Sequence, residues 1–586
     1  MPSHPSIVVV GSPSLDRVGS GAEQRLSVGG AAFLTALAAR RAGAEVGLLA
    51  RVPAALPAEV AEAFAPGMLD HGGLVEDEDG LPGFEIHYDA EGRASYRGMR
   101  AGAEARVTIA DLPEAWLAAR VVHLSPLAGR TDLQLRALAD LRARGFGGLV
   151  SAGTFLRAVH GEPGRVRALA AGVDLFFCNR EEADVLWGTA PPATAARVCV
   201  SDGPRAVTLW EEGRAQRRPV PEARVLDPTG AGDALCGGFL AGLVLGVDPL
   251  ARGLAQARAV LGDLGGRALL RRRAVLDPAR ILRLGPRVAA AAATAALPFC
   301  GFPFPEAHDP HAADLLAAAT LHQYGFWYAD ERGWTGPMWA RATPGGRRWK
   351  GSDFVWQGFT RAVAEDPTVL EPARVASEPD LIHRILADEH GRCPLPDLEG
   401  HRRLHQAWGL ALPPEGFGPL LATANASTTP GRTLLQILAA MPGYAEDPLQ
   451  KKAILLALIL ARRPERLLDL RDPESLGPIV DYHLMRGCLR TGCVRVDDEE
   501  LRARLAARAW VTAEQEEEVR EACWHALRAL CAASSRSVAE VDGFFFALGR
   551  AGCGEEALPA CDACAIAADC ARAVGLFQPI HRTTAY

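Results

Sequence analysis

The sequence predicts a protein of two parts: an α/β half with a parallel-type sheet covered by helices on both faces, then a mainly α-helical half. The length of 586 residues exceeds what one hydrophobic core usually supports. Up to about residue 285, short apolar runs alternate with helical patterns, which is typical of a parallel sheet. After Leu284 an alanine run and a proline-rich stretch precede segments of helical periodicity. We therefore expect domains at 1–287 and 306–586, joined by a linker at 288–305.

Composition narrows the class of protein. Hydrophobic residues make up 49% and charged residues 23%, as in folded globular chains. The net charge of −7 gives no general attraction to nucleic acid, so we do not expect a nucleic-acid partner. No apolar run reaches the roughly 18 residues that span a bilayer. The N-terminal segment has the pattern of a strand, which predicts a cytoplasmic protein without a membrane anchor. A homodimer is left open.

The first elements follow a common α/β opening. A β-branched run at Ile7–Val10 ends at a glycine turn, and Asp16 comes just beyond it. Asp16 either caps that turn or contacts a substrate. Gly29 and Gly30 lead into an alanine-rich helix that ends at Gly43. Phe84–Tyr88 and the segment 93–96, joined by a glycine-containing turn, predict a β-hairpin.

The strongest chemical signal is the stretch Asp227-Pro-Thr-Gly-Ala-Gly-Asp233, which runs into a small, apolar helix. Small residues at such a turn let backbone amides approach an anion, and the helix dipole adds to the attraction. A carboxylate in the first helical turn, at Asp233, suits phosphoryl transfer, because it can take the proton of the attacking hydroxyl. The alternative is an ordinary loop in which Asp233 only caps a helix.

A second pair of polar residues lies at another predicted helix start. Asn179 and Glu182 follow an apolar strand and are three residues apart, so both face one side of the first turn. This spacing also fits a capping box, in which each side chain bonds the other residue's amide. Together with Asp233, the functional interpretation is favoured.

These motifs resemble the ribokinase (PfkB) family of sugar and nucleoside kinases over about residues 5–285. The resemblance implies a ribokinase-like fold whose hairpin forms a small β lid, with ATP and Mg²⁺ as cofactors. It also implies that Asp233 is the catalytic base and that Thr229, Gly230, Ala231 and Gly232 form an anion hole for the ATP phosphates. Asn179 and Glu182 would bind Mg²⁺ and phosphate. Asp16, Gly29 and Gly30 would bind the substrate. One departure is Leu34, which stands where the family usually has asparagine and favours an atypical substrate.

The helical half opens with many aromatic residues around Trp327. They predict either core packing or a stacking pocket for a flat base. Farther on, Asp481 stands at a helix start, where an acid is usually a cap. The run Val480-Asp-x-His-x-x-Arg-x-x-x-Arg-x-Gly492 nevertheless resembles the helix-hairpin-helix DNA glycosylases. In these enzymes this aspartate stabilises an oxocarbenium-like sugar as the base leaves.

Four cysteines close to the end of the sequence are spaced Cys-x7-Cys-x2-Cys-x5-Cys, at Cys553, Cys561, Cys564 and Cys570. Four thiolates in one loop match the ligand count of a [4Fe–4S] cluster or of a tetrahedral Zn²⁺. Unmetallated thiols are the third alternative. The same glycosylases carry a similar loop, one residue shorter in its first gap, that binds a [4Fe–4S] cluster, so the resemblance favours the cluster.

One absence argues against DNA repair. Met441-Pro-Gly443 lacks the second glycine of a DNA-binding hairpin. Over about residues 305–586 the chain is more similar to queuosine 5′-phosphate N-glycosylases of the same helical superfamily. That resemblance implies a glycosylase-like fold, Asp481 as the catalytic residue, and Trp327, Lys452 and His483 as substrate-binding residues.

Taken together, the two halves predict a bifunctional nucleoside salvage enzyme. The first half would phosphorylate a modified nucleoside with ATP, and the second would hydrolyse the nucleoside 5′-phosphate to the free base, with queuosine and queuine as the expected pair. One alternative is a sugar kinase fused to a DNA base-excision glycosylase. The other is a kinase fused to a non-catalytic iron–sulfur module.

Overall fold

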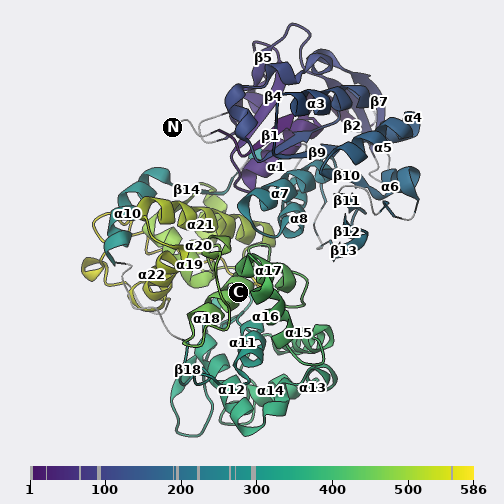
Figure 1. Cartoon of the computed structure of the whole chain (residues 1–586). Coiled ribbons are helices and arrows are strands. Elements are labelled where there is room, and N and C mark those ends of the chain that lie inside the picture. The colour runs from purple at the N-terminus through teal and green to yellow at the C-terminus, as the bar shows by residue number, and fades with distance from the viewer. Residues whose placement is uncertain are drawn as a thin grey trace. The chain divides into compact units, whose positions relative to one another are not determined.

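The computed structural model describes residues 4–20, 23–64, 68–88, 94–188, 190–192, 197–220, 223, 225–262, 266–270, 272–291, 299–555 and 559–586. The chain folds into two compact units, Met1–Arg271 and Arg272–Tyr586 (Figure 1). Each unit has its own hydrophobic cores. The predicted linker includes residues 292–298, which lie outside the described residues. No helix of the described chain is both long and apolar enough to cross a membrane.

The first unit is built on one large sheet. Its strands, in spatial order, are β13 (Arg214–Pro219), β12 (Ala206–Glu211), β11 (Arg197–Ser201), β10 (Leu175–Asn179), β9 (Leu149–Gly153), β8 (Val121–Leu124), β1 (Ile7–Val10), β4 (Val46–Val52) and β5 (Leu74–Glu76). The pairs from β11 to β5 are parallel. β12 and β13 add to one edge in antiparallel fashion, which the alternating pattern did not predict.

Helices cover both faces of this sheet. They are α1 (Ala31–Arg41), α2 (Ala58–Glu62), α3 (Thr131–Ala143), α4 (Leu156–Gly161), α5 (Pro163–Gly172), α6 (Arg180–Trp187), α7 (Ala231–Leu245), α8 (Pro249–Val260) and α9 (Arg267–Leu270), with 3₁₀ turns at Gly102–Arg106, Ile109–Asp111 and Glu114–Ala118. Ile7 and Val9 of β1 face the core under α1, α7 and α8. Val8 and Val10 face the core under α3 and α5. Alternate strand residues thus enter opposite cores, as expected for a doubly covered sheet.

A smaller sheet stands beside the large one. Its order is β3 (Glu23–Gly29), β2 (Ser14–Ser20), β6 (Gly83–Tyr88) and β7 (Ala94–Arg100). β6 and β7 pair antiparallel and form the predicted hairpin; the connecting residues 89–93 lie outside the described chain. The prediction of an α/β domain with a small β lid is confirmed.

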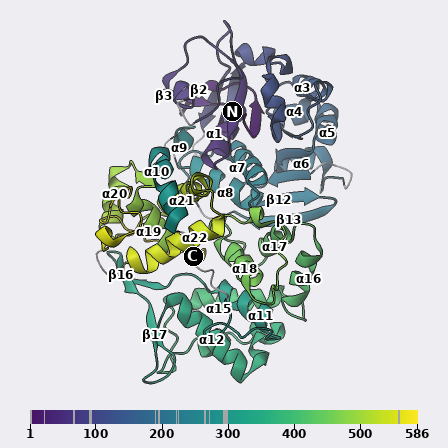
Figure 2. The same cartoon turned by 60° about the vertical axis from the view of Figure 1, so that its left-hand side comes forward.

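The second unit is mainly helical, which confirms that part of the prediction; the likeness to a glycosylase fold stays a prediction. Its helices are α10 (Pro278–Ala291), α11 (Ala312–Leu321), α12 (Gly351–Glu365), α13 (Pro372–Ser377), α14 (Leu381–Ile385), α15 (Leu398–Ala411), α16 (Gly418–Ala426), α17 (Pro430–Leu438), α18 (Lys451–Arg462), α19 (Tyr482–Thr491), α20 (Glu499–Ala506), α21 (Ala513–Ser534) and α22 (Val538–Ala547). Its short antiparallel pairs are β14 (Ala274–Leu276) with β19 (Val494–Val496), β15 (Trp327–Ala329) with β16 (Trp334–Pro337), and β17 (Trp339–Arg341) with β18 (Arg348–Lys350). Figure 2 shows α19, α20 and α22 grouped around α21.

Helix α7 lies unusually close to its neighbours because its buried side is formed by glycines. A Cβ at Gly237 would stand 2.2 Å from the Thr35 carbonyl oxygen of α1, and one at Gly238 would stand 2.5 Å from the Arg252 carbonyl oxygen of α8. Only glycine permits both approaches. This packing fixes the helix that carries Asp233.

We expect Gly237→Ala to destabilise the first unit by about 1–3 kcal/mol, because the added methyl group must push α7 off α1. Gly164→Ala is the matched control, since Gly164 lies in α5 with no heavy atom within 4 Å of the added Cβ; it should be neutral or stabilising by up to about 1 kcal/mol. Urea unfolding of the two variants measures the difference. Equal stability of the two would contradict the packing argument.

Candidate functional site

The turn before α7 has the geometry that the sequence motif predicts. Gly230 adopts a left-handed conformation (φ 82°, ψ 0°) at the N-cap, so the chain turns sharply into the helix. The carboxylate of Asp227 accepts a hydrogen bond from the Thr229 amide at 2.8 Å, which holds the turn from the other side. Asp233 lies in the first helical turn and is partly buried. The amides of this turn lie at the positive end of the helix dipole, where an anion binds best.

One cavity of about 400 Å³ joins most of the predicted residues of this half. Its wall includes the turn Thr229, Gly230, Ala231, Gly232 and Asp233, together with Asn179 and Glu182 at the start of α6. The two groups of residues are about 50 positions apart in sequence, and the fold places them in the wall of the same cavity. A volume of this size suits a small-molecule ligand.

The two acids of this cavity hold their protons more tightly than usual. Burial raises the pKa of Asp233 to about 7. Burial, and next the negative charge of Asp233, raise the pKa of Glu182 to about 7, although a hydrogen bond from the Asn179 amide opposes the shift. A carboxylate with a pKa near neutral pH is a more effective proton acceptor than an ordinary aspartate.

Asn179 and Glu182 also form the capping box that their spacing allows. The Asn179 side chain accepts the Glu182 amide at 2.9 Å, and Glu182 Oε2 accepts the Asn179 amide at 2.8 Å. The cap fixes the Glu182 carboxyl group at the cavity wall. The structural and the functional interpretations of this pair are therefore compatible.

The predicted substrate residues lie at the junction of the lid and α1. Asp16 on β2 is 6% exposed; its carboxylate accepts hydrogen bonds from the Ser14 hydroxyl at 2.9 Å and from the Phe84 amide at 3.0 Å. Burial raises its pKa to about 6. Gly29 passes so close that a Cβ there would stand 2.7 Å from the Asp16 carboxylate. Gly30 forms the N-cap of α1.

Helix α1 connects this junction with the anion turn. Leu34, the departure from the resembled family, is buried against the turn: a Cβ at Gly230 would stand 2.4 Å from its side chain. Thr35 donates a hydrogen bond from its hydroxyl to the Asp233 carbonyl oxygen at 3.2 Å. The helix therefore supports Asp233 and places a hydrocarbon group beside the turn at Gly230.

His123 and Cys236 are among the residues of the cavity wall that sequence reasoning missed. His123 on β8 is buried, its Nδ1 lies 3.0 Å from the Ser151 hydroxyl, and the Cys236 sulfur lies 3.7 Å away. Burial lowers the pKa of His123 to about 3, so the ring is neutral. The apolar run around His123 gives no sign that this histidine lines a cavity. Cys236 could have been predicted, because it lies one helical turn after Asp233 and so on the same face of the helix.

In the second unit, Asp481 is the N-cap of α19. Its Oδ1 accepts the amides of His483 at 2.8 Å and of Leu484 at 3.0 Å, and the residue is 9% exposed. Burial raises its pKa, against the lowering effect of the Lys451 ammonium group. The capping interpretation is thus observed, and the carboxyl group stands among charged neighbours.

A second buried acid lies next to Asp481. Asp542 of α22 accepts the Ile479 amide at 3.1 Å. Burial raises the pKa of Asp542 to about 8, and Asp481 contributes to this shift. At neutral pH, Asp542 is therefore mostly protonated. The sequence offered no signal for it, since an isolated aspartate in an apolar helix is not distinctive.

The predicted substrate residues of this unit have different surroundings. Lys452 donates from Nζ to the Leu321 carbonyl oxygen at 3.1 Å and lies over the Tyr324 ring at 5.1 Å; burial lowers its pKa to about 7. His483 Nδ1 lies 3.0 Å from the Arg486 guanidinium and 3.3 Å from the Gly549 carbonyl oxygen. Trp327 is buried in a small apolar cluster with Phe577 and Ile580, which corresponds to the core-packing alternative.

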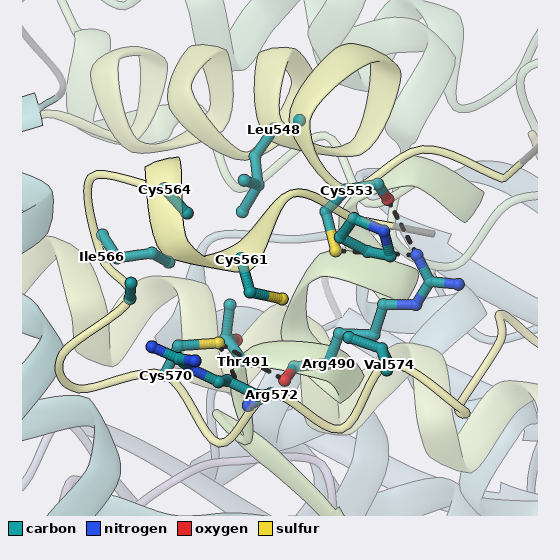
Figure 3. Close-up of a pocket in the computed structure, with 13 residues that line it drawn as sticks. Arg490, Thr491, Leu548, Cys553, Cys561, Cys564, Ile566, Cys570, Arg572 and Val574 are labelled. Atoms are coloured by element: carbon teal, nitrogen blue, oxygen red, sulfur yellow. Dashed lines mark hydrogen bonds between the residues drawn. The ribbon is translucent and has the colours of Figure 1, made fainter. Parts of the chain in front are cut away.

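The four predicted cysteines line one cavity (Figure 3). Figure 3 shows the sulfur atoms of Cys553, Cys561 and Cys570 pointing into the space between the loop and α19. The Arg490 guanidinium lies 3.6 Å from the Cys553 sulfur, and the Arg572 amide donates to the Cys570 sulfur at 3.3 Å. Positive charge and N–H donors directed at sulfur suit a negatively charged cluster.

Within the described residues, no group of three or more His, Cys, Asp or Glu side chains is arranged to hold a metal ion. A cluster or a Zn²⁺ ion at this loop therefore stays a prediction.

Three buried histidines form a hydrogen-bonded chain that sequence reasoning missed. His322 Nδ1 lies 2.9 Å from His401 Nδ1, and His322 Nε2 lies 3.0 Å from His405 Nδ1. All three rings are at most 1% exposed. His401 and His405 are four residues apart on α15, a spacing that could have predicted their shared face. Each neutral ring has one N–H, so His322 can donate to only one of its two neighbours and must accept from the other. The three histidines therefore have only two arrangements of protons that satisfy both hydrogen bonds.

The histidine chain predicts acid sensitivity. Burial holds the pKa of His405 at about 4 and those of His322 and His401 well below their usual value. Below the unfolded pKa of about 6.5, the unfolded chain therefore binds more protons. We expect stability to fall as pH drops below 6.5, by up to about 4 kcal/mol per pH unit for three histidines.

Urea unfolding at several pH values, followed by tryptophan fluorescence, measures this slope, because eight of the 11 tryptophans lie in the second unit. His405→Asn keeps a polar group near the Nδ1 position and removes one titrating ring, so its slope should be about one third smaller. Identical slopes in both proteins would contradict the prediction.

Comparison with known proteins identifies the first half. Residues 6–270 match the model of the pfkB family of carbohydrate kinases. A cytidine kinase of Thermococcus kodakarensis is 29% identical over 285 residues, which are 44% of this chain and 97% of the relative. A probable sugar kinase of Rhizobium etli matches with 18% identity, a TM-score of 0.41, and coverage of 45% of this chain and 94% of that chain. A Burkholderia thailandensis nucleoside kinase in complex with inosine matches with 17% identity, a TM-score of 0.40, and coverage of 44% and 92%.

The family match lies in the first half of the chain. The motif residues predicted for phosphoryl transfer fall inside the matched range and line one cavity. Residues 6–270 of the chain therefore form a kinase domain of the PfkB family of carbohydrate kinases.

Proposed function

We propose that this chain phosphorylates a nucleoside with ATP in the cavity beside α7, and that Asp233 is the catalytic base. One observation carries the proposal: a carboxyl group with a pKa of about 7 stands in the first turn of a helix whose N-terminal amides face the same cavity. A nucleoside is the favoured acceptor because the cytidine kinase is 29% identical over nearly its whole length.

The proposed step moves one proton and one phosphoryl group. Asp233 accepts the proton of the substrate hydroxyl, the hydroxyl oxygen attacks the γ-phosphorus, and the bond to the β-phosphate oxygen breaks to release ADP. The amides of Gly230, Ala231 and Gly232, with Thr229, hold the charge on the transferred group. Mg²⁺, when bound, neutralises phosphate charge, and Asn179 and Glu182 are the residues placed to hold it, directly or through water.

Substrate recognition is proposed for the lid side. Asp16 accepts two protein hydrogen bonds already, yet its remaining lone pairs can accept a sugar hydroxyl. Gly29 packs against the Asp16 carboxylate and Gly30 against the Ser14 backbone, so both are proposed to contribute by positioning Asp16. Leu34 offers hydrocarbon where the resembled family offers an amide, which favours a nucleoside that needs no polar contact there.

The helical half is proposed to cleave the product. The proposal rests on two neighbouring buried carboxyl groups, Asp481 and Asp542, whose pKa values are raised by burial. In glycosidases a pair of carboxyl groups breaks the glycosidic bond: one group protonates the leaving group and the other stabilises the cationic sugar. We propose hydrolysis of a nucleoside 5′-phosphate to its base and ribose 5-phosphate. Queuosine is the best candidate nucleoside by resemblance. His483, whose amide donates to the Asp481 carboxylate, Lys452 and Trp327 are the candidate substrate-binding residues.

The cysteine loop is proposed to hold a [4Fe–4S] cluster through Cys553, Cys561, Cys564 and Cys570. The arginine and amide groups directed at two of these sulfurs support the proposal. Its role would be structural, because Arg490 ties the loop to α19, the helix that Asp481 caps.

The kinase reaction should depend on the protonation of Asp233. We expect kcat/KM to rise with pH and to level off above about 7, since the base must be deprotonated. Asp233→Asn should lower kcat by about 10²–10⁴-fold. ADP release with a nucleoside panel that includes cytidine and queuosine measures both effects. Asp184→Asn is the control, because Asp184 lies on α6 and does not line the cavity. If the Asp233→Asn protein were as active as this control, Asp233 could not be the catalytic base.

Base release should depend on Asp481 independently of the kinase. We expect Asp481→Asn to lower the release of queuine from presupplied queuosine 5′-phosphate by at least about 10²-fold, with phosphorylation of the nucleoside unchanged. Asp498→Asn is the matched control, because Asp498 caps α20 by accepting a hydrogen bond from the Leu501 amide. Comparison of the two variants distinguishes the loss of a helix cap from the loss of a catalytic group.

Mass spectrometry of base and nucleotide gives the rates, and iron and acid-labile sulfide per chain show whether the cluster persists. Release at the parental rate by Asp481→Asn, or no release by the parent with an intact cluster, would refute the hydrolytic step.

A further inference from the structure

A second large cavity, of about 660 Å³, lies entirely in the helical half. We call it the arginine cavity, because four guanidinium groups line it: Arg341 on β17, Arg348 on β18, Arg392 in the loop after α14, and Arg582. It contains none of the residues assigned to phosphoryl transfer or base release. Its size is that of a small-molecule site.

The charge of this cavity is opposite to that of the whole chain. Two acids, Asp388 and Glu389, stand against the four arginines. Asp388 Oδ1 is occupied by the amides of His390 at 2.8 Å and Arg392 at 2.9 Å, and Glu389 lies 3.8 Å from Arg341. The cavity thus has an excess of two positive charges in a chain whose net charge is −7. Such a local excess attracts an anion.

Two of the four guanidinium groups are already engaged. Arg341 is paired with Glu389, and Arg582 donates to the Trp327 carbonyl oxygen at 2.9 Å while lying 4.0 Å above the Trp327 ring. Within the described residues, neither Arg348 nor Arg392 forms an ion pair with a carboxylate at 4.0 Å or less. Their forked donors match the geometry of a phosphate group.

The same cavity has aromatic walls. The Tyr328 side chain is 40% exposed, and its hydroxyl is fixed by a 2.8 Å hydrogen bond to the Pro394 carbonyl oxygen. The Trp339 ring lies opposite the Arg348 guanidinium at 5.2 Å. An exposed ring that is held in place at its hydroxyl offers a preformed surface for stacking a flat base.

We propose that the arginine cavity binds a nucleoside monophosphate, with its phosphate at Arg348 and Arg392 and its base against Tyr328. The choice of a nucleotide rests on the proposed function, since phosphoryl transfer in the first unit produces such a molecule. The cavity is a binding site separate from Asp481, so the second unit would retain or sense the product of the first.

Isothermal titration of the full chain with cytidine monophosphate tests the site. Because the kinase cavity and the proposed hydrolytic site at Asp481 can also take this ligand, we expect the arginine cavity to add one bound molecule per chain to those held elsewhere. Arg348→Glu and Arg392→Glu should each abolish this additional binding or weaken it by at least about tenfold, as expected for loss of a charged hydrogen bond to phosphate. Kinase kcat and KM should stay unchanged. Arg347→Glu is the matched control, because Arg347 is adjacent in sequence, lies over Trp349 at 4.3 Å and does not line the cavity.

Three outcomes would overturn the proposal. The first is binding by Arg348→Glu and Arg392→Glu that equals that of Arg347→Glu. The second is inorganic phosphate that displaces the nucleotide at equal concentration, which indicates an anion site without base recognition. The third is a single-stranded oligonucleotide that binds more tightly than the monophosphate. The nucleotide is supplied ready-made, so a failure of phosphoryl transfer would leave this result intact.

Discussion

The turn from Gly230 into α7 is the constraint on which the first unit depends. The left-handed glycine lets the chain enter the helix at the edge of the sheet, and glycines farther along the helix let it lie against α1 and α8. Asp233 stands in the first turn of this helix, where burial raises its pKa to about 7. The position of this acid therefore depends on a helix that fits only if its buried side carries almost no side chains.

The two aspartates at the centre of the proposed function stand in contrasting surroundings. Asp233 borders an open cavity shared with a Gly-rich anion turn. Asp481 uses one oxygen to cap α19 and is 9% exposed, near the buried Lys451 ammonium group and the buried Asp542 carboxyl group. The first arrangement is ready for a substrate as it stands. Because Asp481 is buried, the hydrolytic step proposed for it requires the surrounding residues to move before a substrate can enter.

Much of the first unit was predictable from sequence. Strand and helix periods predicted the doubly covered sheet, and the spacing of glycine and acid in residues 227–233 predicted the turn that carries Asp233. The antiparallel edge at β13 was missed, because its arginine-rich sequence lacks apolar alternation. In the second unit, helices were predictable, but the contacts that matter join residues far apart in sequence: His322 with His401, and Asp542 with the segment before Asp481. Local patterns do not encode such pairings, and only the packed fold reveals them.

The most direct test of the account is a crystal structure of the chain with a nucleoside, Mg²⁺ and a non-hydrolysable ATP analogue. The account predicts the nucleoside hydroxyl within hydrogen-bond distance of the Asp233 carboxylate, with the γ-phosphate over the amides of Gly230–Gly232. A nucleoside bound elsewhere, with the Asp233 carboxylate facing only protein atoms, would contradict it.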